Sequence, residues 1–396
     1  MPLKPSGAEV SETPNPTIVA GSAVASPSAY SQTAPDDVGS VASVPTVSVI
    51  IPCLNEAQTI IPLLENLASQ YLPQHYEILV VDGMSSDDTR SLVRQFIQEH
   101  PEIAVKLLDN PAKHIPAALN LGIATAKGNI IVRMDAHSIP CPNYVRQCVA
   151  SLQNSDATIV GMPWKIEPGD ESLVGRSIAL ASSHPFGVGD AQYRRYVTGP
   201  PVAVDTVPFG VFRKATWTSL KGFNENLLTN EDYDFNYRAR KSGGRVLLDR
   251  AGYSRYFART TLSDLACQYL RYGRWKLEML RLHPQSLRAR QLAAPGFVLL
   301  VLLLTLLSFE SVLARFVLGG LLLCYSLGAL LFASRISWKQ RDFRLSPIVA
   351  ASFAAMHFPW GAGFLWALFF THPRAKNNEV ATQGQTPESD CIASPR

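Results

Sequence analysis

Three stretches that are apolar over most of their length limit the fold more than any other feature. Residues 47–52, 76–82 and 129–135 are short, rich in Val and Ile, and do not alternate regularly between apolar and polar side chains. Such runs are typical of strands that helices cover on both faces. Segments with the apolar spacing of helices lie between them, which indicates βαβ units. The predicted fold class is therefore α/β, with a mixed, mostly parallel sheet.

The expected elements alternate through one domain, residues 46–261. The expected strands are residues 47–52, 76–82, 104–108, 129–135, 157–161, 206–213 and 245–249, and the expected helices are residues 57–70, 87–99, 116–126, 142–154, 172–183 and 231–242. Residues 163–205 are punctuated by Gly and Pro, and a long segment of this kind inside a domain is more often a binding loop than filler. Candidate acceptor contacts there, with solvated loop charges as the alternative, are His184, Asp190, Arg194 and Arg195.

The two ends of the chain differ from this domain. Residues 1–45 are rich in Ser, Pro, Ala, Val and Thr and hold only five charges, so we expect a disordered leader, with the alternative that its last part joins the domain. Residues 372–396 are expected to form a disordered tail. Residues 262–290 combine regularly spaced apolar side chains with basic ones, the composition of a helix lying on an anionic bilayer. An ordinary surface helix is the alternative.

The region of residues 291–371 is strongly apolar. Three spans are each long enough to cross a hydrocarbon core of about 30 Å: residues 292–309, 312–333 and 347–370. The connector of residues 334–346 is basic, and positive charge favours the cytoplasmic side. We therefore expect a multi-pass protein of the inner (plasma) membrane with a cytoplasmic catalytic domain.

Charge and cysteine content exclude several classes of function. The formal net charge of +4 over 396 residues is too small to argue for nucleic acid as a partner. The six cysteines contain no CxxC pair, so the pattern predicts neither a zinc site nor a disulfide framework, and it suits a reducing compartment.

Polar residues follow the first two expected strands, where open α/β sheets bind ligands. Glu56, in the segment of residues 52–56, is a candidate for contacts with a nucleotide base or ribose, while Asn55 could simply cap a helix. Asp82 ends the second strand and is a candidate to accept hydrogen bonds from ribose hydroxyls or from a uracil N–H. The alternative for Asp82 is an ordinary βα turn with an acidic cap.

Asp135 and His137 follow the strand of residues 129–135. Side chains two apart on an extended segment point the same way, so both could face one ion. Carboxylate and imidazole are metal ligands, and Mn²⁺ or Mg²⁺ would bridge the two phosphates of a sugar nucleotide. The alternative is that His137 caps the next helix or bonds a backbone group.

Two further motifs carry candidate chemistry. Glu231 and Asp232 open an expected helix, where acids also compensate the helix dipole. Asp232 is the candidate general base that takes a proton from an acceptor hydroxyl. Arg271 and Arg274 are candidates for clamping a diphosphate or the acceptor, and Trp275 for stacking on a sugar or lying at the bilayer interface.

Together these motifs, in this order, resemble those of the family 2 glycosyltransferases over residues 46–276. More narrowly, residues 133–137, 207–210, 230–232 and 268–276 resemble the succinoglycan-biosynthesis type of exopolysaccharide glycosyltransferase, as do residues 356–365 near the end of the chain. The resemblance implies a GT-A fold. It also implies that Pro52, Glu56 and Asp82 hold the uridine part of the donor. The implied substrate-binding residues are in full Pro52, Glu56, Asp82, Glu231, Arg271, Arg274 and Trp275.

The resemblance further implies roles for the acidic residues. Asp135 and His137 would hold a divalent metal ion and the diphosphate, and Asp232 would be the catalytic base. His137 departs from the wider family, which has Asp there, so the identity of the metal stays open. The family inverts the anomeric configuration by one direct displacement, which parallels inverting hydrolysis with a sugar acceptor in place of water.

The resulting hypothesis is an inverting, metal-dependent hexosyltransferase of exopolysaccharide or cell-surface glycan synthesis. Its expected partners are a nucleotide-sugar donor, most simply a UDP-sugar, a lipid-linked saccharide acceptor, membrane lipids and other polysaccharide-assembly proteins. Two alternatives stay open. One is a processive polysaccharide synthase, for which three spans are few, and the other is a sugar-nucleotide-binding membrane protein without activity.

Overall fold

The computed structural model describes residues 47–70, 76–288 and 290–371. The predicted leader and tail, at residues 1–45 and 372–396, lie outside the described residues. Within the described residues an eight-stranded sheet has the order β3-β2-β1-β4-β9-β6-β10-β8. Its strands are β1 Val47–Cys53, β2 Tyr76–Asp82, β3 Ala104–Asp109, β4 Ile130–Arg133, β6 Ile159–Gly161, β8 Val202–Ala203, β9 Val211–Arg213 and β10 Val246–Leu248.

The sheet is mixed. Strands β3, β2, β1 and β4 run parallel to one another, and β6 runs parallel to β10. Strand β9 lies antiparallel between β4 and β6, and β8 is antiparallel to β10. Every residue of β1 and β2 is buried, which confirms that these apolar runs are covered on both faces. The expected strand of residues 206–213 is real only at its end, where β9 forms.

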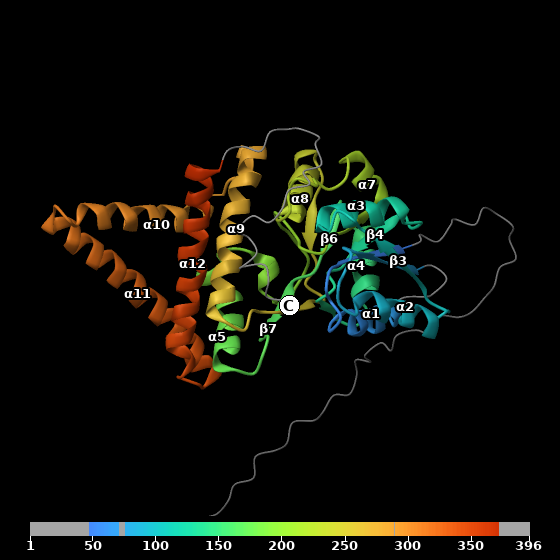
Figure 1. Ribbon diagram of the computed structural model, residues 1–396, viewed down its shortest axis with the longest axis horizontal. Helices are drawn as coiled ribbons and strands as arrows, with labels where there is room; N and C mark the ends of the chain where they lie inside the picture. Colours follow the sequence, from blue (N-terminus) through green and yellow to red (C-terminus); the bar gives the residue numbers. More distant parts are fainter. Residues whose placement is uncertain (1–46, 71–75, 289, 372–396) are drawn as a thin grey trace, which may run out of the picture. The chain divides into compact units, whose positions relative to one another are not determined.

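Helices cover both faces of the sheet (Figure 1). Helices α1 Ile60–Ala68, α2 Thr89–Glu99 and α4 Tyr144–Gln153 pack on one face. Helices α3 Ile115–Thr125 and α8 Glu231–Lys241 pack on the other, with α7 Lys214–Ser219 beside them. The predicted α/β architecture is therefore confirmed.

A second sheet has three short strands that were not predicted. Strand β11 Ser254–Phe257 pairs with β5 Ile139–Pro140 and with β7 Trp164–Glu167. Strand β7 leads into helix α5 Leu173–Ser182, the short helix α6 Pro185–Val188 and the 3₁₀ turn η2 Gln192–Arg194. The predicted loop of residues 163–205 is thus largely structured, and it crosses the carboxyl edge of the main sheet toward the C-terminal helices.

Helix α9 Leu262–Leu282 lies beside α12 Leu345–Phe370 (Figure 1). The two helices approach closely because each has a glycine in the contact. A Cβ atom added at Gly273 would lie 2.1 Å from the carbonyl oxygen of Trp360, and one at Gly363 would lie 2.1 Å from that of Leu270. α9 is therefore packed against α12 and also carries basic side chains such as Arg271 and Arg274.

Helices α10 Arg290–Leu307 and α11 Val312–Gln340 extend away from α12 and meet at a short turn (Figure 1). Leu306, Phe309, Leu313 and Phe316 near this turn are each more than 65% exposed. α11 continues to Gln340 instead of ending at residue 333, so most of the expected connector is helical. By length and composition, α11 and α12 are long enough to cross a membrane, whereas the apolar helix at residues 291–307 is shorter.

Candidate active site

Strand β4 ends at Arg133, two residues before Asp135. Asp135 begins a turn in which the backbone N–H and the hydroxyl of Ser138 both donate to the carbonyl oxygen of Asp135. The prediction that Asp135 and His137 share one side of an extended strand is therefore wrong in its geometry. The turn still places both residues at the carboxyl end of β4.

Arg133 connects this turn to helix α8. Its guanidinium is buried, with Nε 3.1 Å from Asp135 Oδ1 and Nη2 2.8 Å from Glu231 Oε1. The two carboxylates raise the pKa of Arg133 although burial opposes its charge. The remaining Nη1 group is buried without a hydrogen-bond partner among the described residues. Arg133 is therefore a fixed cation with a donor left over for a ligand.

Helix α8 begins at Glu231, after Asn230 adopts a left-handed conformation with φ of 69°. Its first two residues, Glu231 and Asp232, both line a cavity, and Glu231 is also held in the ion pair with Arg133. Burial and the neighbouring Glu231 charge raise the pKa of Asp232 to about 7, against the attraction of Arg133. A carboxylate with such a pKa is suited to accept a proton near neutral pH.

His137 and Glu56 form the other part of the site. His137 Nδ1 lies 3.1 Å from Glu56 Oε1, and Glu56 Oε2 accepts a 2.6 Å hydrogen bond from Thr59. Burial lowers the pKa of His137, but the Glu56 and Asp135 carboxylates outweigh it and raise that pKa overall. A carboxylate that holds one imidazole nitrogen leaves the other for a metal, an arrangement common around histidine ligands.

The residues fit a divalent metal in part. Among the described residues, no group of three or more His, Cys, Asp or Glu side chains is arranged to hold a metal ion. Asp135 and His137 supply one oxygen and one nitrogen donor, a set that suits Mn²⁺. The remaining ligands of such an ion would have to come from a diphosphate and water.

Asp82 lies at the carboxyl end of β2, as predicted, but its side chain is fully buried. Its oxygens accept hydrogen bonds from the backbone and hydroxyl of Ser85 and from Arg90, at 2.5 to 3.0 Å. These contacts lower the pKa of Asp82 although burial opposes them. In this structure Asp82 orders the turn after β2, as the alternative interpretation held. Its contact with a nucleotide, like that of the buried Pro52, stays a prediction.

A cavity of about 700 Å³ extends from the candidate catalytic acids to the C-terminal helices. Arg133, Asp135 and Asp232 line it, as do Phe297 of α10 and Trp360 of α12. The cavity therefore has a charged part beside the sheet and an aromatic part between the apolar helices. Such a shape is suited to a ligand with a polar head and an apolar tail.

Helix α9 forms one wall of this cavity through Tyr269, Tyr272 and Lys276. The described residues that line it do not include Arg271, Arg274 or Trp275. Trp275 instead packs against the cluster formed by Leu227, Tyr233, Tyr237 and Met279. The motif identified the correct helix, but the neighbouring face of that helix meets the cavity, so the roles of Arg271, Arg274 and Trp275 stay predictions.

The structure separates the four charged candidates of residues 163–205. Arg194 is buried and lines the cavity, whereas Asp190 and Arg195 are exposed. His184 lies elsewhere, beside the rings of Phe332 and Phe353.

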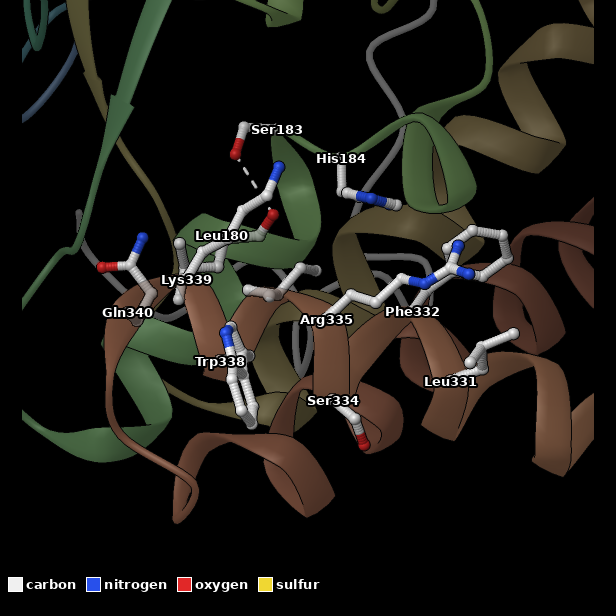
Figure 2. A pocket seen from close by; sticks show the side chains of 11 residues that line it. Leu180, Ser183, His184, Leu331, Phe332, Ser334, Arg335, Trp338, Lys339 and Gln340 are labelled. Atoms are coloured by element: carbon white, nitrogen blue, oxygen red, sulfur yellow. Dashed lines mark hydrogen bonds between the residues drawn. The ribbon is translucent and has the colours of Figure 1, made fainter.

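His184 belongs to a second hollow of about 710 Å³ between α5 and the end of α11. Figure 2 shows Arg335, Trp338 and Lys339 of α11 around this hollow, together with Leu180 of α5 and Ser183, which follows α5. None of the described residues that line it is a candidate catalytic residue. The second hollow is therefore a surface feature of the apolar helices and not the active site.

Sequence reasoning missed Arg133 and Lys276 as members of the site. Arg133 stands in an apolar strand directly before the Asp135 motif, and a lone charge in a buried strand is a signal that demands a partner. Lys276 directly follows Trp275, and only the helical register reveals that it shares a face with Tyr269 and Tyr272.

Comparisons with known proteins agree with this geometry. Residues 48–217 match the family model described as glycosyl transferase family 2. The chain is 27% identical over 320 residues to the succinoglycan biosynthesis protein ExoA of Rhizobium meliloti, which is 80% of this chain and 93% of that protein.

A second relative is the dolichyl N-acetyl-alpha-D-glucosaminyl phosphate 3-beta-D-2,3-diacetamido-2,3-dideoxy-beta-D-glucuronosyltransferase of Methanococcus voltae. It is 25% identical over 240 residues, which cover 59% of this chain and 74% of that protein. Among solved structures, the mannosyltransferase PcManGT from Pyrobaculum calidifontis, in complex with GDP-Man and Mn²⁺, matches with a TM-score of 0.53 and 18% identity. That match covers 80% of this chain and 88% of the other. The predicted GT-A fold is confirmed.

Proposed function

We propose that this chain, which belongs to the family 2 glycosyltransferases, transfers a sugar from a nucleotide-diphosphate donor to a lipid-linked saccharide at a membrane. The observation that carries the proposal is the cavity, because Asp135 and Asp232 line the same space as the apolar helices α10 and α12. We further propose a UDP-sugar as the donor and exopolysaccharide or cell-surface glycan as the product.

The names of relatives support the acceptor class. ExoA of Rhizobium meliloti is named for succinoglycan biosynthesis, and the Methanococcus voltae relative is named for a dolichyl-linked acceptor. A relative from Pseudomonas savastanoi, 32% identical over 171 residues, is named as an undecaprenyl-phosphate transferase. The last two names each contain a phosphate joined to a long apolar lipid, which matches the two-part lining of the cavity.

The proposed reaction is one direct displacement. Asp232, when deprotonated, accepts the proton of an acceptor hydroxyl as that oxygen forms a bond to the anomeric carbon of the donor. The bond from the anomeric carbon to the diphosphate breaks at the same time, so the electron pair leaves with the nucleotide diphosphate and the configuration inverts. One base is sufficient for this reaction, and the position of Asp232 in the cavity wall supports its role.

Arg133 is suited to stabilise the leaving group. It is held beside Asp135, and its unpartnered Nη1 group can donate to a phosphate oxygen. Asp135 and His137 are the proposed ligands of Mn²⁺ or Mg²⁺. When bound, the ion would act as a Lewis acid that neutralises charge on the diphosphate.

The proposed site of action is the inner membrane, with the catalytic domain in the cytoplasm. The exposed apolar side chains near the α10–α11 turn support insertion of this hairpin into lipid. The basic residues at the end of α11, among them Arg335, Lys339 and Arg341, support a cytoplasmic position for that end.

The test is a nucleotide-release assay with the purified full chain in lipid nanodiscs. Several UDP-sugars are offered with an extracted lipid-linked saccharide fraction, with and without Mn²⁺, and sugar transfer to the lipid is measured in parallel. Asp232→Asn should lower turnover by roughly 10²- to 10⁴-fold while UDP binding is unchanged. Asp156→Asn, which alters an exposed surface carboxylate, is the matched control.

The same assay separates the alternatives. Near-normal turnover of Asp232→Asn would refute the assignment of the base. Products that lengthen by many sugars on one acceptor would indicate a processive synthase. UDP binding without release of product from any donor or acceptor would indicate a sensor without activity.

A further inference from the structure

Two buried cations in the wall of the cavity have no carboxylate partner in the part of the chain that the structure describes. Arg194 is 8% exposed and Lys276 is 5% exposed, and both line the cavity. Among the described residues, no carboxylate lies within ion-pair distance of either side chain. Buried charges are costly unless they are paired, so two in one cavity indicate a site for an anion.

Arg194 is held by aromatic rings. Its guanidinium carbon lies 5.2 Å from the centroid of Trp164, 5.8 Å from that of Tyr193 and 5.9 Å from that of Tyr272. Its Nη1 donates a long hydrogen bond of 3.4 Å to the hydroxyl of Tyr269. These contacts fix the position of the guanidinium and offset part of the cost of burying it, but they do not neutralise its charge.

Lys276 is held in a similar way. Its Nζ atom lies 3.8 Å from the centroid of the Tyr233 ring, the residue that follows Asp232 in α8. Burial lowers the pKa of Lys276 to about 8, although Asp205 and Asp232 act in the opposite direction. An anion beside the amine would favour its charged form.

The lining of the cavity indicates which anion these cations meet. Arg133 and Asp135, proposed for the donor diphosphate, line the part of the cavity beside the sheet, but Pro52, Glu56 and Asp82, predicted to bind the uridine part, are not among the described lining residues. Away from the sheet, the lining includes Arg194 and Lys276 together with the aromatic side chains Phe297 and Trp360. An anion bound here would therefore be attached to an apolar group and would lie on the acceptor side of Asp232.

We propose that Arg194 and Lys276 bind the phosphate group of the lipid-linked acceptor, with its polyprenyl chain lying between α10 and α12. This inference rests on the proposed function, because it assumes an acceptor whose sugar is joined to lipid through phosphate. It assigns one part of the acceptor to each part of the cavity. The saccharide reaches Asp232, the phosphate meets the two cations, and the lipid occupies the aromatic part.

The experiment measures binding and does not depend on turnover. The probes are farnesyl diphosphate and farnesol, which share a short polyprenyl chain and differ in the anion. Both are titrated against the full chain in nanodiscs, in EDTA so that no divalent ion can recruit the diphosphate to Asp135. UDP binding, with and without Mn²⁺, is measured on the same samples.

Wild-type protein should bind farnesyl diphosphate at least tenfold more tightly than farnesol, since charge-assisted hydrogen bonds to phosphate are strong. Arg194→Gln and Lys276→Gln should each remove most of this preference, while Arg194→Lys and Lys276→Arg should keep part of it. UDP binding should be unchanged in all four variants. Arg94→Gln and Lys241→Gln, which alter exposed cations, are the matched controls.

Three outcomes would overturn the inference. They are no preference for the diphosphate in wild-type protein, a preference that survives both Gln variants, and a loss of UDP binding as large as the loss of farnesyl diphosphate binding. The last would assign the cations to the donor. If Arg194→Gln does not fold, Lys276→Gln and the wild-type comparison still decide. A clear preference in a protein that transfers no sugar would refute the proposed function and leave the anion site standing.

Discussion

The substitution Glu231→Gln should shift the pH dependence of the enzyme toward acid. The pKa of Asp232 is raised from its ordinary value of 3.8 to about 7, chiefly by burial and next by the charge of Glu231, while Arg133 opposes the rise. Glu231→Gln removes the second cause. It also releases Arg133 from its 2.8 Å ion pair, which leaves more of its positive charge to stabilise the Asp232 carboxylate. Both effects lower the pKa of Asp232.

The size of the shift can be bounded from the structure. The total rise is about 3 pH units, and burial, the larger cause, is unchanged by the substitution. We therefore expect the pKa of Asp232 to fall by about 1 pH unit, equivalent to about 1.4 kcal/mol. A base works when deprotonated, so activity is lost as pH falls through its pKa. At pH 6 about a tenth of the base is deprotonated in wild type and about half in the variant.

The assay is the pH profile of kcat/KM for sugar transfer, with each variant scaled to its own plateau. Scaling is needed because loss of the contact with Arg133 is expected to lower the plateau itself. Glu65→Gln, an exposed carboxylate on α1, should leave the profile unchanged. An acid limb of Glu231→Gln that stays in place or moves to higher pH would refute the assignment of this limb to Asp232.

Three further changes have defined expectations. Asp135→Asn should weaken UDP binding in the presence of Mn²⁺ by roughly tenfold or more and leave UDP binding in EDTA unchanged. Isothermal titration calorimetry measures both affinities. Equal losses under the two conditions would contradict the role of Asp135 as a metal ligand. Gly273→Ala should lower the unfolding temperature in detergent by several degrees, because its Cβ would lie 2.1 Å from the Trp360 carbonyl oxygen. A Cβ at Gly296 would meet no described atom of another element within 4 Å, so the control Gly296→Ala should leave the unfolding temperature unchanged. Leu313 is 72% exposed, and Leu313→Asp should reduce flotation of the protein with lipid vesicles, because placing a carboxylate in the hydrocarbon core costs about 3 kcal/mol of free energy. Unchanged flotation would contradict insertion of the α10–α11 turn.

The sequence was sufficient for the central sheet because its main strands are continuous apolar runs. β1 and β2 are buried at every position, and no other element type fits runs of that length and composition. Strands β5 and β8 have two residues each, too few for any periodicity. They form because neighbouring strands present free backbone groups to them, and this depends on tertiary contacts that no local pattern contains.

Site residues that belong to a motif after a strand or at a helix start could be predicted from the sequence. Residues whose place in the site depends on burial could not. Asp135 follows the end of β4, where α/β sheets place ligand sites, and Asp232 in the first turn of α8 lines the same cavity. Arg194 was one of four charged candidates on one loop, and its sequence neighbours do not distinguish it from Arg195. Only the contact of η2 with α9 buries Arg194 and leaves Arg195 exposed.

Hydropathy also could not separate lipid from protein as the neighbour of an apolar helix. α11 and α12 are both long and apolar enough to span a membrane, but 11% of an apolar segment of 18 residues is buried in α11 and 44% in α12. Gly361 and Gly363 explain part of the difference, because they let α12 approach the backbones of α10 and α9. An apolar run with small residues at close spacing is therefore ambiguous between the two environments.

Helix α9 contacts both the apolar helix α12 and the cavity proposed to bind the acceptor. Gly273 packs against α12, while Tyr272 and Lys276, on a neighbouring face of the same helix, line the cavity. α12 also contributes Met356 and Trp360 to that lining, so the cavity wall does not exist without the apolar helices. Of the residues proposed to hold the uridine part, Pro52 and Asp82 lie on β1 and β2 and Glu56 follows β1, and none of the three is among the described residues that line the cavity. We therefore expect detergents that disturb the packing of α12 on α9 to weaken acceptor binding before they weaken nucleotide binding, and the opposite order would contradict the assignment of the cavity to the acceptor.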